Sequence, residues 1–136
     1  MIQIDRGIAG ARIGNTRAEV RAALGTPARV IAGTNDFGAF TEYRYHGRIR
    51  VIFQGGSTGT AVSSVVTRGL GDRTARGVGV GSSERAVRRK VPGVKCETTS
   101  GFRSCHTGDF LAGQRITDFA IRHKRVTRVT VGIVLD

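Results

Sequence analysis

Two cysteines and one histidine are the residues of this sequence that come closest to a recognisable chemical site. Cys96, Cys105 and His106 lie in the segment KCETTSGFRSCHTGDF. A Ser-Gly turn between the cysteines would let two short paired strands bring them opposite each other. Two thiols and one imidazole are one ligand short of a zinc site and lack the close C-x-x-C pairing typical of zinc. We therefore expect a Cys96–Cys105 disulfide, ahead of free thiols or a metal site.

The other residues of catalytic type show no arrangement that is typical of an enzyme. His46 and His123 lie in expected turns, and no histidine has a nucleophile and an orienting acid at a recognised spacing. The run GVGVGSS resembles a phosphate-binding loop, but it has neither the P-loop lysine nor the spacing of a dinucleotide loop. We therefore expect a protein that is not an enzyme, with no catalytic residue, no small-molecule cofactor and no metal. The candidate acids lie in expected loops or at the terminus: Asp5, Asp36, Asp72 and Asp136.

The stretch GNTRAEVRAALGTP predicts a helix of the kind that opens a helix-turn-helix. Thr16 can cap the helix with Glu19 as its capping-box partner, and Gly25 followed by Pro27 ends it. A DNA-reading motif would need a second helix directly after Gly25. The following ARVIAGTNDFGAF is instead β-branched, glycine-broken and extended in character, so the motif is incomplete.

An internal repeat accounts for this helix. IGNTRAEVRAALGTP aligns with VGSSERAVRRKVPGV at an offset of 67 residues, so that Thr16 falls on Ser83 and Val20 on Val87. Farther along, IRVIFQGGSTGTAVSSVVT and TDFAIRHKRVTRVTV both read as two alternating strands around a turn. The sequence therefore predicts two α+β units with antiparallel sheets, residues 1–70 and 71–136, which together form one compact body.

The charge of the sequence has two explanations. The net charge is +12, and most of the 22 Lys and Arg residues are Arg. The guanidinium group is a planar fork that suits carboxylate or phosphate and is common at protein interfaces, which favours an acidic partner. The excess is spread over the chain, however, so a genome rich in Arg codons and a generally basic surface explain it equally well.

The compartment is indicated by the cysteines more than by the N-terminus. No segment has the length and apolarity of a membrane-spanning helix, and MIQIDRGIAG lacks the basic and apolar regions of a signal peptide. The chain is therefore either cytosolic or a mature form whose leader has been removed. Because disulfides persist in oxidising compartments, we expect a secreted protein or a protein of the periplasm or cell envelope.

A tandem pattern is formed by two segments, ARIGNTRAEVRAALGTP and VGVGSSERAVRRKVPGVKC, each followed by an expected small antiparallel sheet. This pattern resembles the β-lactamase inhibitory protein family and the related BamE (SmpA/OmlA)-type outer-membrane lipoproteins. The resemblance implies an α+β tandem repeat of two helix-helix-antiparallel-sheet units, with the helices packed on one face of the sheets. The CET at 96–98, Cys105 and the GDF at 108–110 are similar to the inhibitors, in which a disulfide braces a repeat. The resemblance further implies that Asp109 and Phe110 insert into the substrate cleft of an enzyme.

These observations favour a non-enzymatic extracytoplasmic protein-binding module, such as an inhibitor of a secreted enzyme like a β-lactamase. The alternative is a BamE-like structural or assembly protein of the cell envelope. A basic nucleic-acid-binding protein is less favoured, because neither a recognition helix nor an RNP-type aromatic pair accompanies the charge. We expect the interface on the sheet faces that point away from the helices. Its candidate residues are cations for an acidic partner, Arg48, Arg50, Arg115, Arg122 and Arg128, and aromatic anchors, Tyr43, Tyr45 and Phe110.

Overall fold

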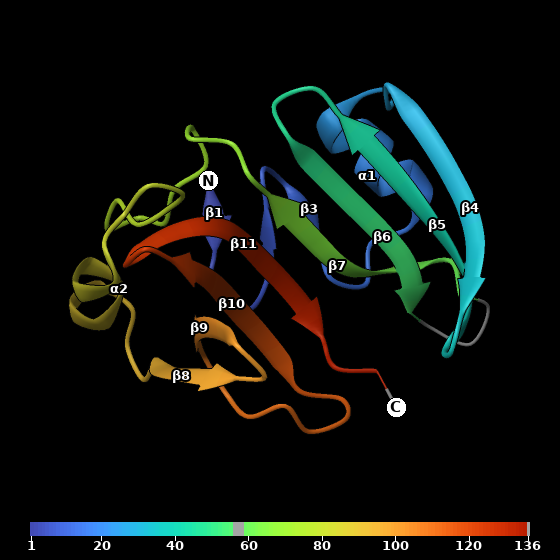
Figure 1. Ribbon diagram of the computed structural model, residues 1–136. Helices are drawn as coiled ribbons and strands as arrows, with labels where there is room; N and C mark the ends of the chain where they lie inside the picture. The colour runs from blue at the N-terminus through green and yellow to red at the C-terminus, as the bar shows by residue number, and fades with distance from the viewer. Residues whose placement is uncertain (56–58, 136) are drawn as a thin grey trace.

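One large antiparallel sheet dominates the fold. The computed structural model describes residues 1–55 and 59–135, in which eight strands form this sheet and three very short strands form a second one (Figure 1). The described helices are α1 (Arg17–Leu24) and α2 (Glu84–Lys90). The small sheet consists of β1 (Ile2–Gln3), β2 (Gly7–Ile8) and β3 (Ala11–Arg12). The large sheet consists of β4 (Arg29–Asn35), β5 (Gly38–Tyr45), β6 (Ile49–Gly55), β7 (Ala61–Thr67), β8 (Lys95–Thr99), β9 (Phe102–His106), β10 (Arg115–Arg122) and β11 (Arg125–Ile133).

The strand order of the large sheet, β4-β5-β6-β7-β11-β10-β9-β8, is symmetric about its centre. Each half is a four-stranded meander, and the halves meet where their last strands, β7 and β11, pair antiparallel. In this central pair Val65 lies opposite Val131 and Thr67 lies opposite Val129. One continuous sheet therefore crosses the boundary between residues 1–70 and 71–136, and the division into these two units stays a prediction.

The predicted start of the first helix is confirmed. The Thr16 hydroxyl accepts a hydrogen bond from Glu19 N at 3.2 Å, and Thr16 N donates to Glu19 Oε1 at 3.0 Å, which is a capping box. The Ser83 hydroxyl caps α2 by accepting from Ala86 N at 3.1 Å. A short hydroxyl side chain thus satisfies one of the free N–H groups at the start of each helix.

The expected α+β repeat of helix-helix-sheet units is wrong, because the protein is mostly β. In the described residues each half carries one helix instead of two, and these helices have only 8 and 7 residues. The residues before α1 form β1–β3, where Asp5, Ala9 and Gly10 have positive φ angles that a helix does not allow. The residues before α2 form turns with a bridge between Arg73 and Gly79. The centre of the large sheet is therefore covered by the small sheet, which contacts β7 and β11, and not by a helical layer.

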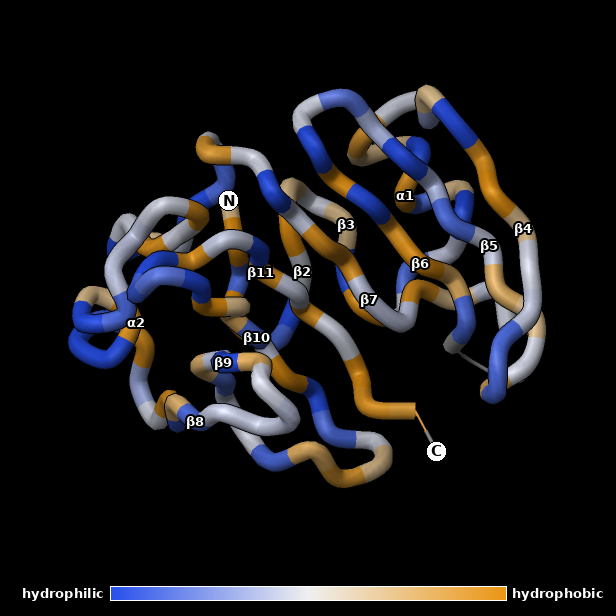
Figure 2. The backbone as a smooth tube through the Cα atoms, viewed as in Figure 1, coloured by the Kyte–Doolittle hydropathy of each residue, from blue (hydrophilic) through white to orange (hydrophobic). Residues whose placement is uncertain are grey.

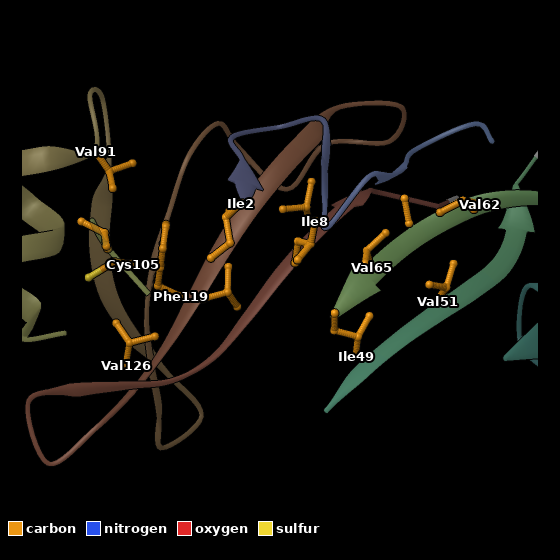
Figure 3. Close-up of a cluster of buried hydrophobic side chains, with 14 of the residues drawn as sticks. Ile2, Ile8, Ile49, Val51, Val62, Val65, Val91, Cys105, Phe119 and Val126 are labelled. Atoms are coloured by element: carbon orange, nitrogen blue, oxygen red, sulfur yellow. The ribbon is translucent and has the colours of Figure 1, made fainter. Parts of the chain in front are cut away.

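The buried face of the large sheet is built from alternate strand residues. On β6, Ile49, Val51 and Phe53 are buried while Arg50 is not, so the predicted alternation is confirmed there. Figure 2 shows the alternation of apolar and polar residues along this strand. Ile8 of the small sheet belongs to the same cluster of buried side chains, which contains residues of both halves (Figure 3). The two halves therefore share one core.

A network of three side chains ties the small sheet to the second half of the protein. Thr107 Oγ1 and Thr117 Oγ1 donate to Asp5 Oδ1 at 2.6 and 2.9 Å. Thr117 Oγ1 also accepts a hydrogen bond from Asp5 N at 2.7 Å. Loss of the hydroxyl of the fully buried Thr117 would leave the half-buried Asp5 N–H without this acceptor, and Asp5 Oδ1 would keep only the hydrogen bond from Thr107.

Thr117→Val should therefore lower the free energy of unfolding by about 1 to 3 kcal/mol, because valine keeps the shape of threonine but removes the hydroxyl. Urea denaturation of the wild type and the variant measures the difference. Thr34→Val, at an exposed position of β4, is the matched control and should change stability by less than about 0.5 kcal/mol. Equal effects of the two substitutions would contradict the role of the network.

Candidate binding face of the sheet

The face of the large sheet that points away from the core carries several of the predicted interface arginines. Arg50 precedes the buried Val51 on β6, and Arg128 precedes the buried Val129 on β11. Because neighbouring side chains of a strand point to opposite faces, both arginines point away from the core. Arg122 lies at the exposed end of β10.

Two depressions lie side by side on this face. The smaller, of about 330 Å³, is bordered mainly by the β5–β6 hairpin, and the larger, of about 700 Å³, by residues of β9, β10 and β11. Arg68, which directly follows β7, lines both depressions and connects them. We call the six arginines that line these two depressions on the outward side of the sheet the arginine face: Arg44, Arg48, Arg50, Arg68, Arg122 and Arg128.

One buried carboxylate neutralises part of the arginine face. Glu42 of β5 is 8% exposed and accepts a hydrogen bond from Arg44 Nε at 2.6 Å. Arg50 Nη1 lies 3.5 Å from its other oxygen. Among the residues that the structure describes, no other member of the arginine face forms an ion pair with an acidic side chain. Within the described part of the chain, four guanidinium groups therefore lack an ion-pair partner: Arg48, Arg68, Arg122 and Arg128.

A second acid, Asp118 of β10, lies in the larger depression. Its Oδ1 and the Nε of Arg128 are buried and have no hydrogen-bond partner in the described part of the chain. Burial raises the pKa of Asp118 above its usual value, an effect that outweighs the opposing hydrogen bond from Ser104 and the charge of Arg128. Both atoms are enclosed by their neighbours, so neither is open to a ligand in the depression.

The predicted inserting pair lies in the loop after β9, close to this face. Asp109 Oδ1 pairs with Lys95 Nζ at 2.8 Å, and this lysine lowers the pKa of Asp109. Phe110 is 53% exposed, and its ring centre lies 4.6 Å from that of His106. His106 is in turn the cross-strand neighbour of Asp118, which lines the larger depression. Through its contact with His106, Phe110 is therefore an exposed apolar group near that depression.

The remaining predicted contact residues are not part of the arginine face. Tyr43 is 4% exposed and its ring centre lies 4.7 Å from that of Phe53, so it belongs to the core and is not a surface anchor. Tyr45 borders the smaller depression, but its hydroxyl donates to Gly25 O at 3.0 Å and burial raises its pKa. Arg115, at the start of β10, lines neither depression.

The predicted disulfide is confirmed. Cys96 and Cys105 are cross-strand partners on β8 and β9 and are bonded to each other. The neighbouring His106 contacts Glu97 Oε1 through Nε2 at 2.8 Å and the carbonyl oxygen of Gly108 through Nδ1 at 3.0 Å. In residues 1–55 and 59–135, no group of three His, Cys, Asp or Glu side chains is placed to hold a metal ion.

Four residues that shape this face are not among the interface residues predicted from the sequence. For Asp118 the sequence did hold a signal, because the alternation around the buried Phe119 places Asp118 and Arg122 on the same outward side. No comparable signal places Arg68 on this face, because no local sequence pattern indicates that β7 pairs with β11. The residues missed are Glu42, Arg44, Arg68 and Asp118.

No family model and no curated protein matches this chain. Among solved structures, a DUF4309 family protein (YjgB) from Bacillus subtilis subsp. subtilis str. 168 has a TM-score of 0.59 and 20% sequence identity, over 91% of this chain and 82% of that one. An extracellular protein containing an SCP domain, from Bacillus anthracis str. Ames, has a TM-score of 0.56 and 13% identity over 89% of this chain. This chain spans only 44% of the length of that protein.

These likenesses concern the fold alone, and they correct the family assignment. The expected resemblance to the β-lactamase inhibitory protein family and BamE-type lipoproteins is wrong, since the similar structures are other proteins and this chain is mostly β. Neither α1 nor α2 is long and apolar enough to cross a membrane.

Asp118→Asn should raise the free energy of unfolding at about pH 7 and leave it unchanged at about pH 3. The folded-state pKa of Asp118 is raised, so its ionisation costs stability as pH rises above the unfolded-state value and costs nothing below it. Urea denaturation at both pH values measures the effect. Asp36→Asn, in an exposed turn, controls for the change in net charge. A variant that is less stable than the wild type at about pH 7 would contradict the burial argument.

Proposed function

We propose that this protein is a non-enzymatic, extracytoplasmic binding module that docks an acidic protein on its arginine face. The observation that carries the proposal is the set of four guanidinium groups that share one face of the sheet without an ion-pair partner among the described residues. Phe110 supplies an exposed apolar contact nearby.

The charge of the arginine face favours an acidic partner. Like charges gathered on one face repel one another and disfavour the isolated folded chain. Carboxylates of a partner would remove this repulsion, and each guanidinium can hold a carboxylate with two parallel hydrogen bonds. Arginine is also enriched at protein interfaces relative to lysine, which supports a protein as the partner.

Small and apolar residues between the arginines favour close contact. Val66 of β7 lies between Arg50 and Thr130 in the sheet and is 5% exposed. Ala120 lies opposite Arg128. Because Val66 is already shielded from water, ion pairs that a partner forms beside it would be less solvated and therefore stronger than fully solvated ones.

The extracytoplasmic location has two supports. The Cys96–Cys105 disulfide is typical of proteins in oxidising compartments. One of the similar structures is that of a protein described as extracellular. We infer that this protein is secreted or belongs to the periplasm or cell envelope.

Binding of fluorescently labelled poly-L-glutamate at physiological salt tests the proposal. Arg68→Gln/Arg128→Gln removes two charges from the arginine face, whereas Arg76→Gln/Arg89→Gln removes two charges from exposed residues outside the strands. We expect the first double variant to bind at least about tenfold more weakly than the second at equal net charge, a difference of about 1.4 kcal/mol.

Equal losses in the two double variants would show that binding follows net charge alone, and would contradict the proposal. Single-stranded DNA of matched charge is the comparison ligand. If DNA binds more tightly than polyglutamate and depends on Arg68 and Arg128, a nucleic-acid partner replaces the acidic protein.

A further inference from the structure

We propose that the β4 edge of the large sheet pairs antiparallel with the β4 edge of a second copy of this chain, so that the two sheets join into one. β4 is an end strand of the sheet, and among the described residues only β5 pairs with it. Figure 1 shows β4 at the rim of the molecule. The residues of β4, all of which the structure describes, line neither depression, so this inference does not rest on the acidic partner.

The turn between β4 and β5 determines which main-chain groups of β4 point outward. Asn35 pairs with Gly38 across a two-residue turn, and the pair that closes such a turn exchanges two hydrogen bonds. The register with β5 is unbroken, so hydrogen-bonded pairs alternate along β4 from Asn35 back to Arg29. The N–H and C=O groups of the residues in between therefore point away from β5: Val30, Ala32 and Thr34.

These outward groups define one best register for two antiparallel copies. Hydrogen-bonded pairs can form only between outward residues, and a two-fold axis at Ala32 uses all of them. In this register Ala32 lies opposite the partner's Ala32, and Val30 lies opposite the partner's Thr34. Val30 is 52% exposed, and β-branched side chains that face each other across two strands stabilise the pairing.

An apolar contact on the outward face of the sheet favours the same register. Ile31 would lie opposite the partner's Gly33, which has no side chain to obstruct it. Within one chain the ring of Phe40 already covers Gly33, since a Cβ atom there would lie only 2.9 Å from the ring. Ile31 and Phe40 are both half-buried in the single chain, so pairing would bury more of their apolar surface.

The charges at the two ends of β4 favour a second copy as the partner. Arg29 begins the strand and Asp36 directly follows it, and both are exposed. Neither forms an ion pair among the described residues, and the strand between them carries no charge. Antiparallel pairing about Ala32 places Arg29 opposite the partner's Asn35 and thus beside the partner's Asp36. A second copy therefore supplies the opposite charge at both ends of the interface.

The other edge strand of the sheet, β8, is unsuited to such pairing. It has five residues, and the pair that closes its two-residue turn is Thr99 with Phe102, so Cys96 and Thr98 point their main-chain groups outward. The register that uses both would place Glu97 opposite the partner's Glu97. Like charges directly opposite each other destabilise strand pairing, which protects this edge. β4 has no such charge.

The dimer should be weak. The net charge of +12 on each copy opposes association, and contact along one strand buries little surface. We expect the dimer to form at high protein concentration and to dissociate at low micromolar concentration. The urea measurements described above, made at low micromolar protein, therefore concern the monomer.

Sedimentation velocity from about 5 μM to about 1 mM protein at physiological salt, combined with amide hydrogen exchange at both concentrations, tests the inference. We expect a dimer at the high concentration, with slower exchange at the outward amides of Val30, Ala32 and Thr34. The amides of Ile31 and Gly33 point toward β5 and should change little.

Variants test the edge and its register separately. Ala32→Pro removes an outward N–H, which an edge strand tolerates, and should abolish the dimer. Arg29→Asp or Asp36→Arg alone turns attraction into repulsion at both ends and should weaken the dimer at least about tenfold, whereas the double variant Arg29→Asp/Asp36→Arg should restore it. Arg76→Asp, at an exposed position outside the strands, changes the net charge as Arg29→Asp does and should not weaken the dimer. The backbone spectrum of each variant checks that the fold is retained.

Three results would overturn the inference: a chain that stays monomeric at about 1 mM, a dimer that survives Ala32→Pro, or a double variant that dimerises no better than either single variant. A monomer whose Val30, Ala32 and Thr34 amides become protected only after addition of poly-L-glutamate would assign the edge to another protein, and would also overturn it.

Discussion

The antiparallel pairing of β7 with β11 is the interaction on which the rest of the structure depends. Each half of the chain supplies a four-stranded meander, and this pair satisfies the backbone of two strands that would otherwise be open edges. The pairing aligns Val65 with Val131 on the buried side, so that one core serves both halves. It also brings Arg68 from the first half beside Arg128 from the second, in one depression. The arginine face is thus a product of the joining of the halves.

The two faces of the large sheet have different roles, because successive side chains of each strand point to opposite faces. Residues on one side, such as Val51 and Phe119, are fully buried and supply the apolar stabilisation. Residues on the other side include a partly buried acid with a raised pKa, Asp118, and arginines that have no ion-pair partner among the described residues, and these groups disfavour the folded chain. A partner that supplies negative charge would turn the unpaired arginines into favourable contacts. The fold tolerates them because the small sheet and the Asp5–Thr117 network secure the opposite side.

Local features were predictable from the sequence, and long-range ones were not. The capping box at Thr16 depends on neighbouring residues, as does the alternation of β6, and the Cys96–Cys105 disulfide joins strands that share one turn. The two-residue strands β1–β3 are too short to produce a period, so the residues before α1 gave no sign of a sheet. Tyr43 shows the same limit: the side of a strand that becomes buried is decided by packing against Phe53 and by α1, whose Arg21 lies over the tyrosine ring. The site was therefore only partly predictable, because Arg50, Arg122 and Arg128 could be named but their proximity to Arg68 and Asp118 could not.

Modification of arginines by phenylglyoxal, with each site quantified by mass spectrometry, tests most directly whether an acidic partner occupies the arginine face. The protein is treated with and without saturating poly-L-glutamate at physiological salt. The account predicts strong protection at Arg48, Arg68, Arg122 and Arg128, and none at the exposed Arg76 and Arg89, which lie outside the strands. Uniform protection of all exposed arginines, or protection centred on Arg76 and Arg89, would contradict it.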